Sequence, residues 1–237
     1  MSALSGKTAV VTGASRGIGA GIATALSAAG ARVALIARNQ VTLKERAAEI
    51  KGSIPIAADV TDPKSVEKAT ERVRSELGVP DIIVNNAGIF SVAVVEETTG
   101  EQFANMLNTN LVAPFLFARA FLGEMKKRGS GHIITIGSIA DRTIFSGNVA
   151  YSAAKFGLRA VHEVLRTELR GTGVRTSLIS PAATNTEIWN DVTVTDPVTR
   201  PHSKRPMLEP ADVVGAVMYA LTQPATVNID ELRLSHS

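Results

Sequence analysis

The sequence predicts an α/β fold built on a doubly wound parallel sheet, with helices on both faces. Three observations predict this fold. Strand-like and helix-like segments alternate along the 237 residues, a pattern typical of parallel sheets with helical crossovers. The strand-like segments are mostly continuous apolar runs, as expected for strands covered on both faces. No Pro/Gly/Ser-rich linker or short repeat interrupts the chain, which favours one domain over residues 1–237.

Seven segments are expected to form strands. Each is short, rich in β-branched and other apolar residues, and followed by a turn or a helix-like segment. The expected strands are residues 8–12, 33–37, 54–60, 82–86, 132–138, 175–180 and, at the edge of the sheet, 231–235.

Helix-like segments lie between these strands. The first one stops at Gly30, which suits the residue that follows the end of a helix. Asp62 and Pro63 mark the start of another, because Asp caps free N–H groups and Pro fits the first helical position. The expected helices are residues 18–29, 41–51, 63–77, 100–127, 151–170 and 210–222.

Composition argues against several functional classes. The chain has no cysteine and four scattered histidines, so we expect neither disulfides nor a dedicated metal site. No signal peptide and no membrane-length apolar run is visible, so we expect a cytoplasmic protein without membrane contact. The net charge of +3 is dispersed except at residues 200–205, which favours an ordinary surface over a nucleic-acid site.

A glycine-rich turn separates the first strand from the first helix. It reads G-x-x-x-G-x-G over residues 13–19. Glycines permit a tight turn and a close approach of backbone to pyrophosphate, and the helix N-terminus then offers N–H groups to that anion. An ordinary glycine-rich turn is the alternative. The residues expected to bind a dinucleotide here are Gly13, Ser15, Arg16, Gly17, Ile18 and Gly19.

The end of the second strand indicates which dinucleotide is bound. It reads Ile36-Ala37-Arg38-Asn39 and carries no acid. A carboxylate here would hydrogen-bond the ribose hydroxyls of NAD, whereas Arg38 and Arg16 suit a 2′-phosphate. The sequence therefore favours NADP(H) over NAD(H), with two solvated surface arginines as the alternative.

Ser138, Tyr151 and Lys155 form a candidate reacting set. Ser138 ends the fifth expected strand, and Tyr151 and Lys155 share one helix face because they are four residues apart. A nearby ammonium and a cationic nicotinamide would both lower the pKa of the Tyr151 phenol. Tyr151 would then act as general acid or base on a carbonyl/alcohol pair, while Ser138 orients the substrate oxygen and Lys155 also bonds the nicotinamide ribose.

These motifs, together with Asn85-Asn86-Ala87-Gly88, resemble in order and spacing the short-chain dehydrogenase/reductase family. The resemblance runs from Lys7 to the last strand. It implies a single-domain Rossmann fold of about seven strands and an NADP(H)-dependent oxidoreductase acting on a small carbonyl or secondary alcohol.

The resemblance also implies roles for further residues. Asn110 matches the family's catalytic Asn, which would hold a water in a proton relay from Lys155. The family usually has Gly where this chain has Ala182, and alanine lacks the φ freedom of glycine. The ending at residues 227–232 is similar to the branch of NADP-dependent 3-hydroxy acid dehydrogenases. The further implied cofactor-binding residues are Asp59, Val60, Asn86, Ala87, Gly88, Tyr151, Lys155, Pro181, Thr184 and Thr186.

The substrate is expected to lie between Ser138, Tyr151 and a binding loop at about residues 181–209, which contains several prolines. Arg142 would bind a substrate carboxylate, which suits a hydroxy or keto acid, with a surface arginine as the favoured alternative. Among enzymes, a 3-hydroxy acid dehydrogenase or 3-oxoacyl reductase and a broad ketone reductase both remain open. The apolar candidates for the pocket wall are Phe90, Ile144, Phe145 and Trp189.

Two further expectations concern assembly and class. Family members pair the two long helices across a two-fold axis, so we expect a homodimer or homotetramer. A non-catalytic NADP(H)-sensing regulator is the main alternative function, although it would require damage to the catalytic set, which is intact. A nucleic-acid or scaffold protein is suggested only by the basic pI and the cluster at residues 200–205.

Overall fold

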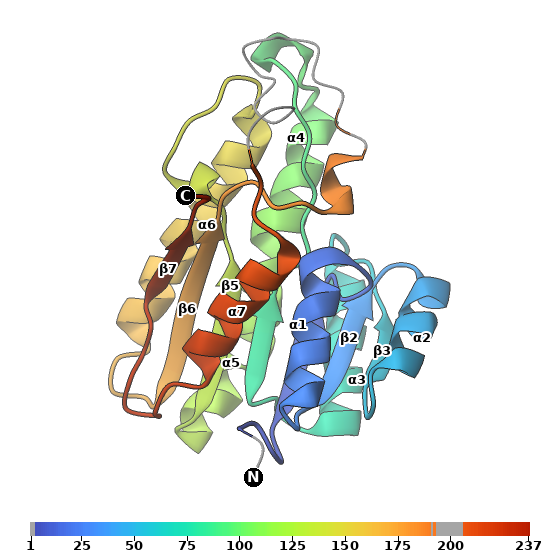
Figure 1. The fold of residues 1–237 in the computed structure, drawn as a ribbon, viewed down its shortest axis with the longest axis vertical. Coiled ribbons are helices and arrows are strands. Elements are labelled where there is room, and N and C mark those ends of the chain that lie inside the picture. Colours follow the sequence, from blue (N-terminus) through green and yellow to red (C-terminus); the bar gives the residue numbers. More distant parts are fainter. Residues whose placement is uncertain (1–2, 191, 193–205) are drawn as a thin grey trace.

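A computed structural model describes residues 3–190, 192 and 206–237 and contains one sheet of seven parallel strands (Figure 1). The strand order is β3-β2-β1-β4-β5-β6-β7, and every pairing is parallel. The predicted fold class is therefore confirmed. The strands are β1 (Thr8–Thr12), β2 (Arg32–Ala37), β3 (Ile54–Ala57), β4 (Ile82–Asn85), β5 (Gly131–Ile136), β6 (Val174–Pro181) and β7 (Glu231–Leu234).

Helices cover both faces of the sheet, and each face has its own apolar core. One core packs α1 and α7 against the sheet through residues such as Ile22 and Val217, and the other packs α3 and α5 through Val73 and Phe117. Figure 1 shows α1 and α7 in front of the sheet. The helices are α1 (Gly17–Ala28), α2 (Gln40–Glu49), α3 (Pro63–Leu77), α4 (Gly100–Leu107), α5 (Ala113–Arg128), α6 (Val149–Glu168) and α7 (Pro210–Leu221).

The helix expected over residues 100–127 is divided, which corrects the prediction. A π-helical turn at Asn108–Val112 separates α4 from α5. Pro114 has no N–H to donate to the carbonyl four residues earlier, at Asn110, so regular α-helical bonding fails at this point. Single π turns within helices often mark functional sites, and this turn contains Asn110.

The long segment between β6 and α7 is described only in part. It includes a 3-10 turn at Glu187–Trp189 and a parallel bridge between Thr184 and Leu208. The basic cluster at residues 200–205 lies outside the described residues, as do Pro197 and Pro201.

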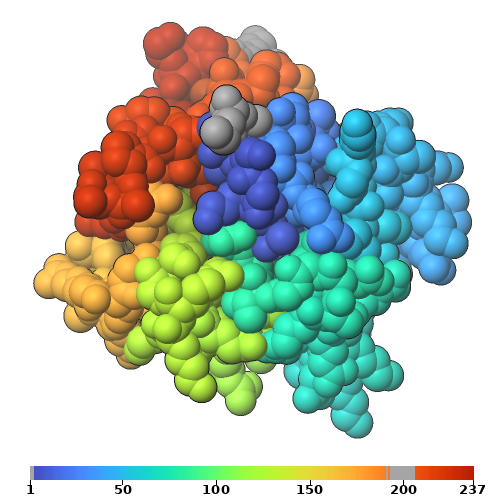
Figure 2. All heavy atoms as spheres, turned by 90° about the horizontal axis from the view of Figure 1, so that it is seen from below, coloured from blue at the N-terminus to red at the C-terminus, as the bar shows by residue number. Residues whose placement is uncertain are grey.

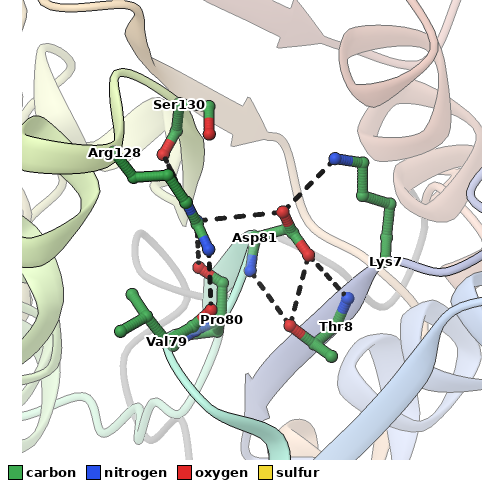
Figure 3. A network of polar contacts seen from close by, with 7 residues as sticks. All are labelled: Lys7, Thr8, Val79, Pro80, Asp81, Arg128 and Ser130. Atoms are coloured by element: carbon green, nitrogen blue, oxygen red, sulfur yellow. Dashed lines mark hydrogen bonds and ion pairs between the residues drawn. The ribbon is translucent and has the colours of Figure 1, made fainter.

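At the amino ends of the strands, polar contacts join β1, β4 and the end of α5 (Figure 3). Asp81 accepts hydrogen bonds from the Thr8 N–H (3.0 Å) and from Lys7 Nζ (3.3 Å). The Arg128 guanidinium donates to the carbonyls of Val79 and Pro80, at 2.9 Å each. Figure 2 views the molecule from this end, where N-terminal, central and C-terminal segments meet.

The carboxyl ends of the strands lie at the opposite end of the sheet. The connections run outward in opposite directions from β1 and β4, so the order reverses between these two strands; ligands of such sheets bind at this position. Within the described residues, no helix is long and apolar enough to cross a membrane. No group of three or more His, Asp or Glu suited to a metal is found in that same part of the chain.

Candidate active site

A cleft of about 1190 Å³ opens at the carboxyl ends of the strands and brings together segments from β1 through α6 and the residues after β6. Most residues predicted for the site line it, but Gly19 and Arg142 do not. The predicted residues that line the cleft are Gly13, Ser15, Arg16, Gly17, Ile18, Arg38, Asp59, Val60, Asn86, Ala87, Gly88, Asn110, Ser138, Phe145, Tyr151, Lys155, Pro181, Thr184, Thr186 and Trp189.

The turn after β1 is shaped to hold an anion. Gly13 has φ +66°, a left-handed conformation that favours glycine. A Cβ on Gly19 would lie 2.2 Å from the Gly13 carbonyl oxygen, so only glycine lets the helix start so close to the turn. The N-cap residue Arg16 makes no side-chain cap, and the first turn of α1 carries no acid. The helix itself therefore supplies no side chain that caps its N-terminal N–H groups, which can bind an anion. Gly19 acts by permitting close packing rather than by lining the cleft.

Thr12 joins the turn after β1 to the residues that follow β4. Its hydroxyl oxygen accepts hydrogen bonds from the N–H groups of Asn86 and Ala87, at 3.0 Å each. The Asn86 side-chain amide donates back to the Thr12 carbonyl at 2.9 Å. The residues that follow β4 are therefore held against the turn that follows β1. Asn85 is buried, and its side-chain amide donates to the Pro114 carbonyl at 3.3 Å.

Charged residues gather at the far end of the cleft from Tyr151. Arg16 and Arg38 are both exposed and both line the cleft. The Asp59 carboxylate accepts hydrogen bonds from the N–H and the hydroxyl of Thr61, at 2.9 and 2.7 Å. These bonds, and then the charge of Arg38, lower the pKa of Asp59 below its usual value. Arg16 and Arg38 both border the cleft, so a guanidinium group can face an anionic group bound there.

Ser138, Tyr151 and Lys155 meet where β5 ends against α6. Ser138 hydrogen-bonds Tyr151, and its hydroxyl also accepts from the Ala140 N–H at 3.1 Å. Lys155 is 6% exposed, and its Nζ donates to the Ile136 carbonyl at 3.0 Å. The same Nζ lies 5.6 Å from the centre of the Tyr151 ring. The geometry therefore places a hydroxyl, a phenol and an amine around one point of the cleft.

Burial has the largest effect on the pKa values of Tyr151 and Lys155. It raises the pKa of Tyr151 to about 12, although the Ser138 hydrogen bond lowers it, and the charge of Asp141 raises it further. Burial also lowers the pKa of Lys155 to about 8, against the charge of Asp141, which raises it. The expectation from the sequence was that a nearby ammonium and a cationic nicotinamide both lower the pKa of Tyr151. Among the groups of this chain, desolvation has the larger effect.

Asn110 holds the loop after β4. Its Oδ1 accepts from the Ile89 N–H at 3.3 Å, and its Nδ2 donates to the Ile89 carbonyl at 3.0 Å. The residue is 1% exposed and borders the cleft from the π-helical turn. Its carboxamide therefore positions the segment that leads to Phe90.

Aromatic rings form the wall next to Tyr151. The Phe90 ring meets the Tyr151 ring edge to face, with centroids 4.8 Å apart, and meets the Trp189 ring at 4.9 Å. Trp189 Nε1 donates to the Thr184 carbonyl at 2.9 Å, which ties the 3-10 turn to the end of β6. Phe145, Ile144 and Ile188 also line the cleft.

Arg142 is turned away from the cleft, which corrects its expected place at the substrate. Its Nε donates to Asp141 at 2.8 Å, and its Nη2 lies 2.6 Å from Glu231 of β7. Two carboxylates therefore already hold the guanidinium.

Two acids near the site were missed by sequence reasoning. Asp141, directly after Ile139 and Ala140, is fully buried; a charged residue in this apolar context was a signal that could have been used. Glu187 lines the cleft, and its Oε2 lies 3.4 Å from the position of a Cβ on Gly17. That closeness depends on the 3-10 turn after β6, which the sequence does not reveal.

Comparisons with known proteins agree with this geometry. A family profile described as short chain dehydrogenase matches residues 7–196. An uncharacterized oxidoreductase of Staphylococcus aureus (strain USA300) is 35% identical over 98% of both chains. The glycine betaine reductase of Emericella nidulans is 36% identical over 97% of this chain, which spans only 18% of that larger protein.

Solved structures extend the comparison. The closed form of a serine dehydrogenase complexed with NADP+ has a TM-score of 0.89 and 32% identity, covering 96% of this chain and 94% of the other. An alcohol dehydrogenase of Thermococcus sibiricus complexed with 5-hydroxy-NADP has a TM-score of 0.84 and 30% identity, covering 96% and 95%. Fold and cleft define a parallel-sheet protein with a dinucleotide-type cradle. The chain belongs to the short-chain dehydrogenase family of oxidoreductases.

Proposed function

We propose that this protein is an NADP(H)-dependent oxidoreductase that moves a hydride between nicotinamide and a carbonyl/secondary-alcohol pair. The observation that carries the proposal is the meeting of Ser138, Tyr151 and Lys155 in one cleft, with the lysine amine anchored on the Ile136 carbonyl. NADP(H) as the cofactor is supported by the two guanidinium groups at the far end of the cleft and by the NADP-bound relatives.

Residues along the cleft support this proposal for successive parts of the cofactor. Residues 13–19 would receive the pyrophosphate, since backbone N–H groups at a helix N-terminus bind phosphate. Arg38 and Arg16 would pair with the 2′-phosphate, and Asp59 would meet the adenine. Pro181, Thr184 and Thr186 would hold the carboxamide. When bound there, the cofactor supplies or accepts the hydride.

Tyr151 is the proposed general acid and base. In reduction its phenol donates a proton to the substrate oxygen, and in oxidation its phenolate takes that proton back. Ser138 orients the same oxygen through its hydroxyl. Lys155 supplies a cation beside the ring, which favours the phenolate over the buried neutral phenol. Asn110 would hold the water that links Lys155 to solvent.

The part of the cleft next to Tyr151 favours a substrate with an apolar substituent on the reacting carbonyl. The rings of Phe90 and Trp189 lie beside Tyr151, and apolar surface in contact with them is removed from water. Arg142 is held by Asp141 and Glu231, which weakens the case for a hydroxy acid bound through that residue. We therefore propose that the substrate is a neutral ketone or aldehyde, in preference to a 3-hydroxy acid or a 3-oxoacyl thioester.

NADPH oxidation against a panel of ketones, keto acids and 3-oxoacyl thioesters tests the function and separates it from a non-catalytic NADP(H) sensor. We expect turnover of neutral ketones above keto acids. NADPH binding without turnover of any member of the panel would favour the sensor.

We also propose that α5 and α6 pair with a second copy of the chain. Phe115 on α5 and Phe156 on α6 are 46% and 38% exposed, and a partner copy seated on these helices would remove this apolar surface from water. Light scattering should give the mass of a dimer or tetramer, and Phe156→Glu should reduce that mass. A monomer for the parent protein would contradict the pairing.

A further inference from the structure

Asp141 is a fully buried carboxylate that the proposed chemistry does not use. It lies in the 3-10 turn Ile139–Asp141, three residues after Ser138. The Ser180 hydroxyl donates to its Oδ2, and Arg142 Nε donates to its Oδ1 at 2.8 Å. A buried carboxylate is costly without such partners. Its presence beside the reacting set therefore calls for a function.

The carboxylate packs against the strand end that holds Lys155. A Cβ on Gly137 would lie 3.1 Å from Asp141 Oδ2 and 2.8 Å from Ser180 Oγ, so only a glycine leaves room for this contact. The carbonyl of the preceding residue, Ile136, accepts the hydrogen bond from Lys155 Nζ. The buried carboxylate thus packs against Gly137, the residue that directly follows the carbonyl bound by the buried amine.

We propose that Asp141 is a positioning residue that keeps Lys155 protonated in its buried place, while Arg142 limits the strength of this effect by partly neutralising the carboxylate. The proposal rests on the proposed function, because it assigns Asp141 a role through the lysine that supports Tyr151. The printed contacts link these groups in pairs: Lys155 Nζ lies 5.6 Å from the centre of the Tyr151 ring, and Arg142 contacts both Asp141 and Glu231 of β7.

The electrostatics of the site agree with this arrangement. Burial lowers the pKa of Lys155 to about 8, and the charge of Asp141 is the effect that opposes it. The same charge raises the pKa of Tyr151. Without Asp141, the lysine would lose its proton nearer to neutral pH, and the phenolate would lose its cationic neighbour. Arg142, placed by sequence reasoning at the substrate, acts in this account behind the reacting set.

The titration of Lys155 tests the proposal directly. Protein labelled with ¹³C at the lysine ε-carbons is titrated by NMR, and the Lys155 resonance is assigned by its loss in Lys155→Met. We expect Asp141→Asn to lower the Lys155 midpoint by about one pH unit, as removal of a nearby opposite charge does. Arg142→Gln should raise the midpoint, because the carboxylate is then less neutralised. An unchanged midpoint in both variants would overturn the proposal.

Glu231→Gln is the matched control. It removes the same charge from the other partner of Arg142 but leaves the carboxylate beside Lys155. We expect the Lys155 midpoint in this variant to lie within error of the parent value. A decrease equal to that of Asp141→Asn would show that any nearby negative charge has the same effect, which would contradict the proposal. If Asp141→Asn does not fold, Arg142→Gln alone tests the proposal. A higher Lys155 midpoint in that variant supports it, and a lower or unchanged midpoint counts against it.

Kinetics then link the shift to the reaction. In Asp141→Asn, the fall of kcat/KM for carbonyl reduction with rising pH should begin at lower pH than in the parent, while activity at acidic pH is retained. The NMR titration requires neither cofactor nor turnover. Absence of turnover by the parent protein would therefore remove the proposed function, and turnover of Tyr151→Phe at the parent rate would remove the role of Tyr151, whereas the Lys155 midpoints would decide on Asp141 separately.

Discussion

The ring of Phe90 lies edge to face on the ring of Tyr151, with centroids 4.8 Å apart. This contact joins the loop after β4 to the start of α6, and the Trp189 ring continues it at 4.9 Å. Phe90 therefore shields the phenol from water and offers an apolar surface where a substrate carbonyl would approach.

Phe90→Ala should weaken the use of apolar substrates. We expect KM for an aryl ketone to rise about tenfold, since loss of apolar contact in a pocket is worth on the order of 1–3 kcal/mol. KM for a small aldehyde should change little. Tyr219→Ala, which removes an exposed ring of α7 outside the cleft, is the control. An equal rise of KM for both substrates would remove Phe90 as a determinant of specificity.

Arg38→Asp should reverse the preference between the two nicotinamide cofactors. The carboxylate would repel a 2′-phosphate and accept hydrogen bonds from ribose hydroxyls. We expect the ratio of dissociation constants for NADP(H) and NAD(H) to change at least tenfold, about 1.4 kcal/mol. Arg170→Asp makes the same charge change at an exposed residue outside the cleft. If the ratio does not move in Arg38→Asp, the assignment of the 2′-phosphate site is wrong.

Glu187→Gln should tighten cofactor binding. Its carboxylate lies close to Gly17, the first residue of α1, where a pyrophosphate is proposed to bind. Removing a like charge there should lower the NADPH dissociation constant severalfold at low salt, and the gain should shrink as salt screens it. Glu101→Gln on α4 serves as the control. Weaker binding in Glu187→Gln would show that the carboxylate helps the cofactor instead.

Arg128→Met should destabilise the amino end of the sheet. The guanidinium donates to the carbonyls of Val79 and Pro80 and faces Asp81 (Figure 3). We expect the free energy of unfolding in urea to fall by about 1–3 kcal/mol, because acceptors of a charged donor are left without it. Arg72→Met, which breaks an exposed pair with Glu76 at 3.9 Å, should cost less than about 1 kcal/mol. Equal losses in both variants would contradict this account.

Local patterns predicted the sheet well because continuous apolar runs and turn glycines are properties of short segments. The strands β1 to β7 lie within a few residues of their expected places. The division of the long helix at Asn108–Val112 was missed, although Pro114 marks it. The orientation of Arg142 could not be predicted, because its partner Glu231 is on a strand far along the chain. The burial of Asp141 depends likewise on Ser180 of β6.

The turnover of Tyr151→Phe tests the central claim most directly. The chain has two tyrosines, and Tyr219→Phe provides a matched control because Tyr219 is 53% exposed on α7. We expect kcat for NADPH-dependent ketone reduction to fall about 10²- to 10⁴-fold in Tyr151→Phe, with NADPH still bound, and to stay unchanged in Tyr219→Phe. Reduction by Tyr151→Phe at the parent rate would contradict the assignment of the proton to this phenol.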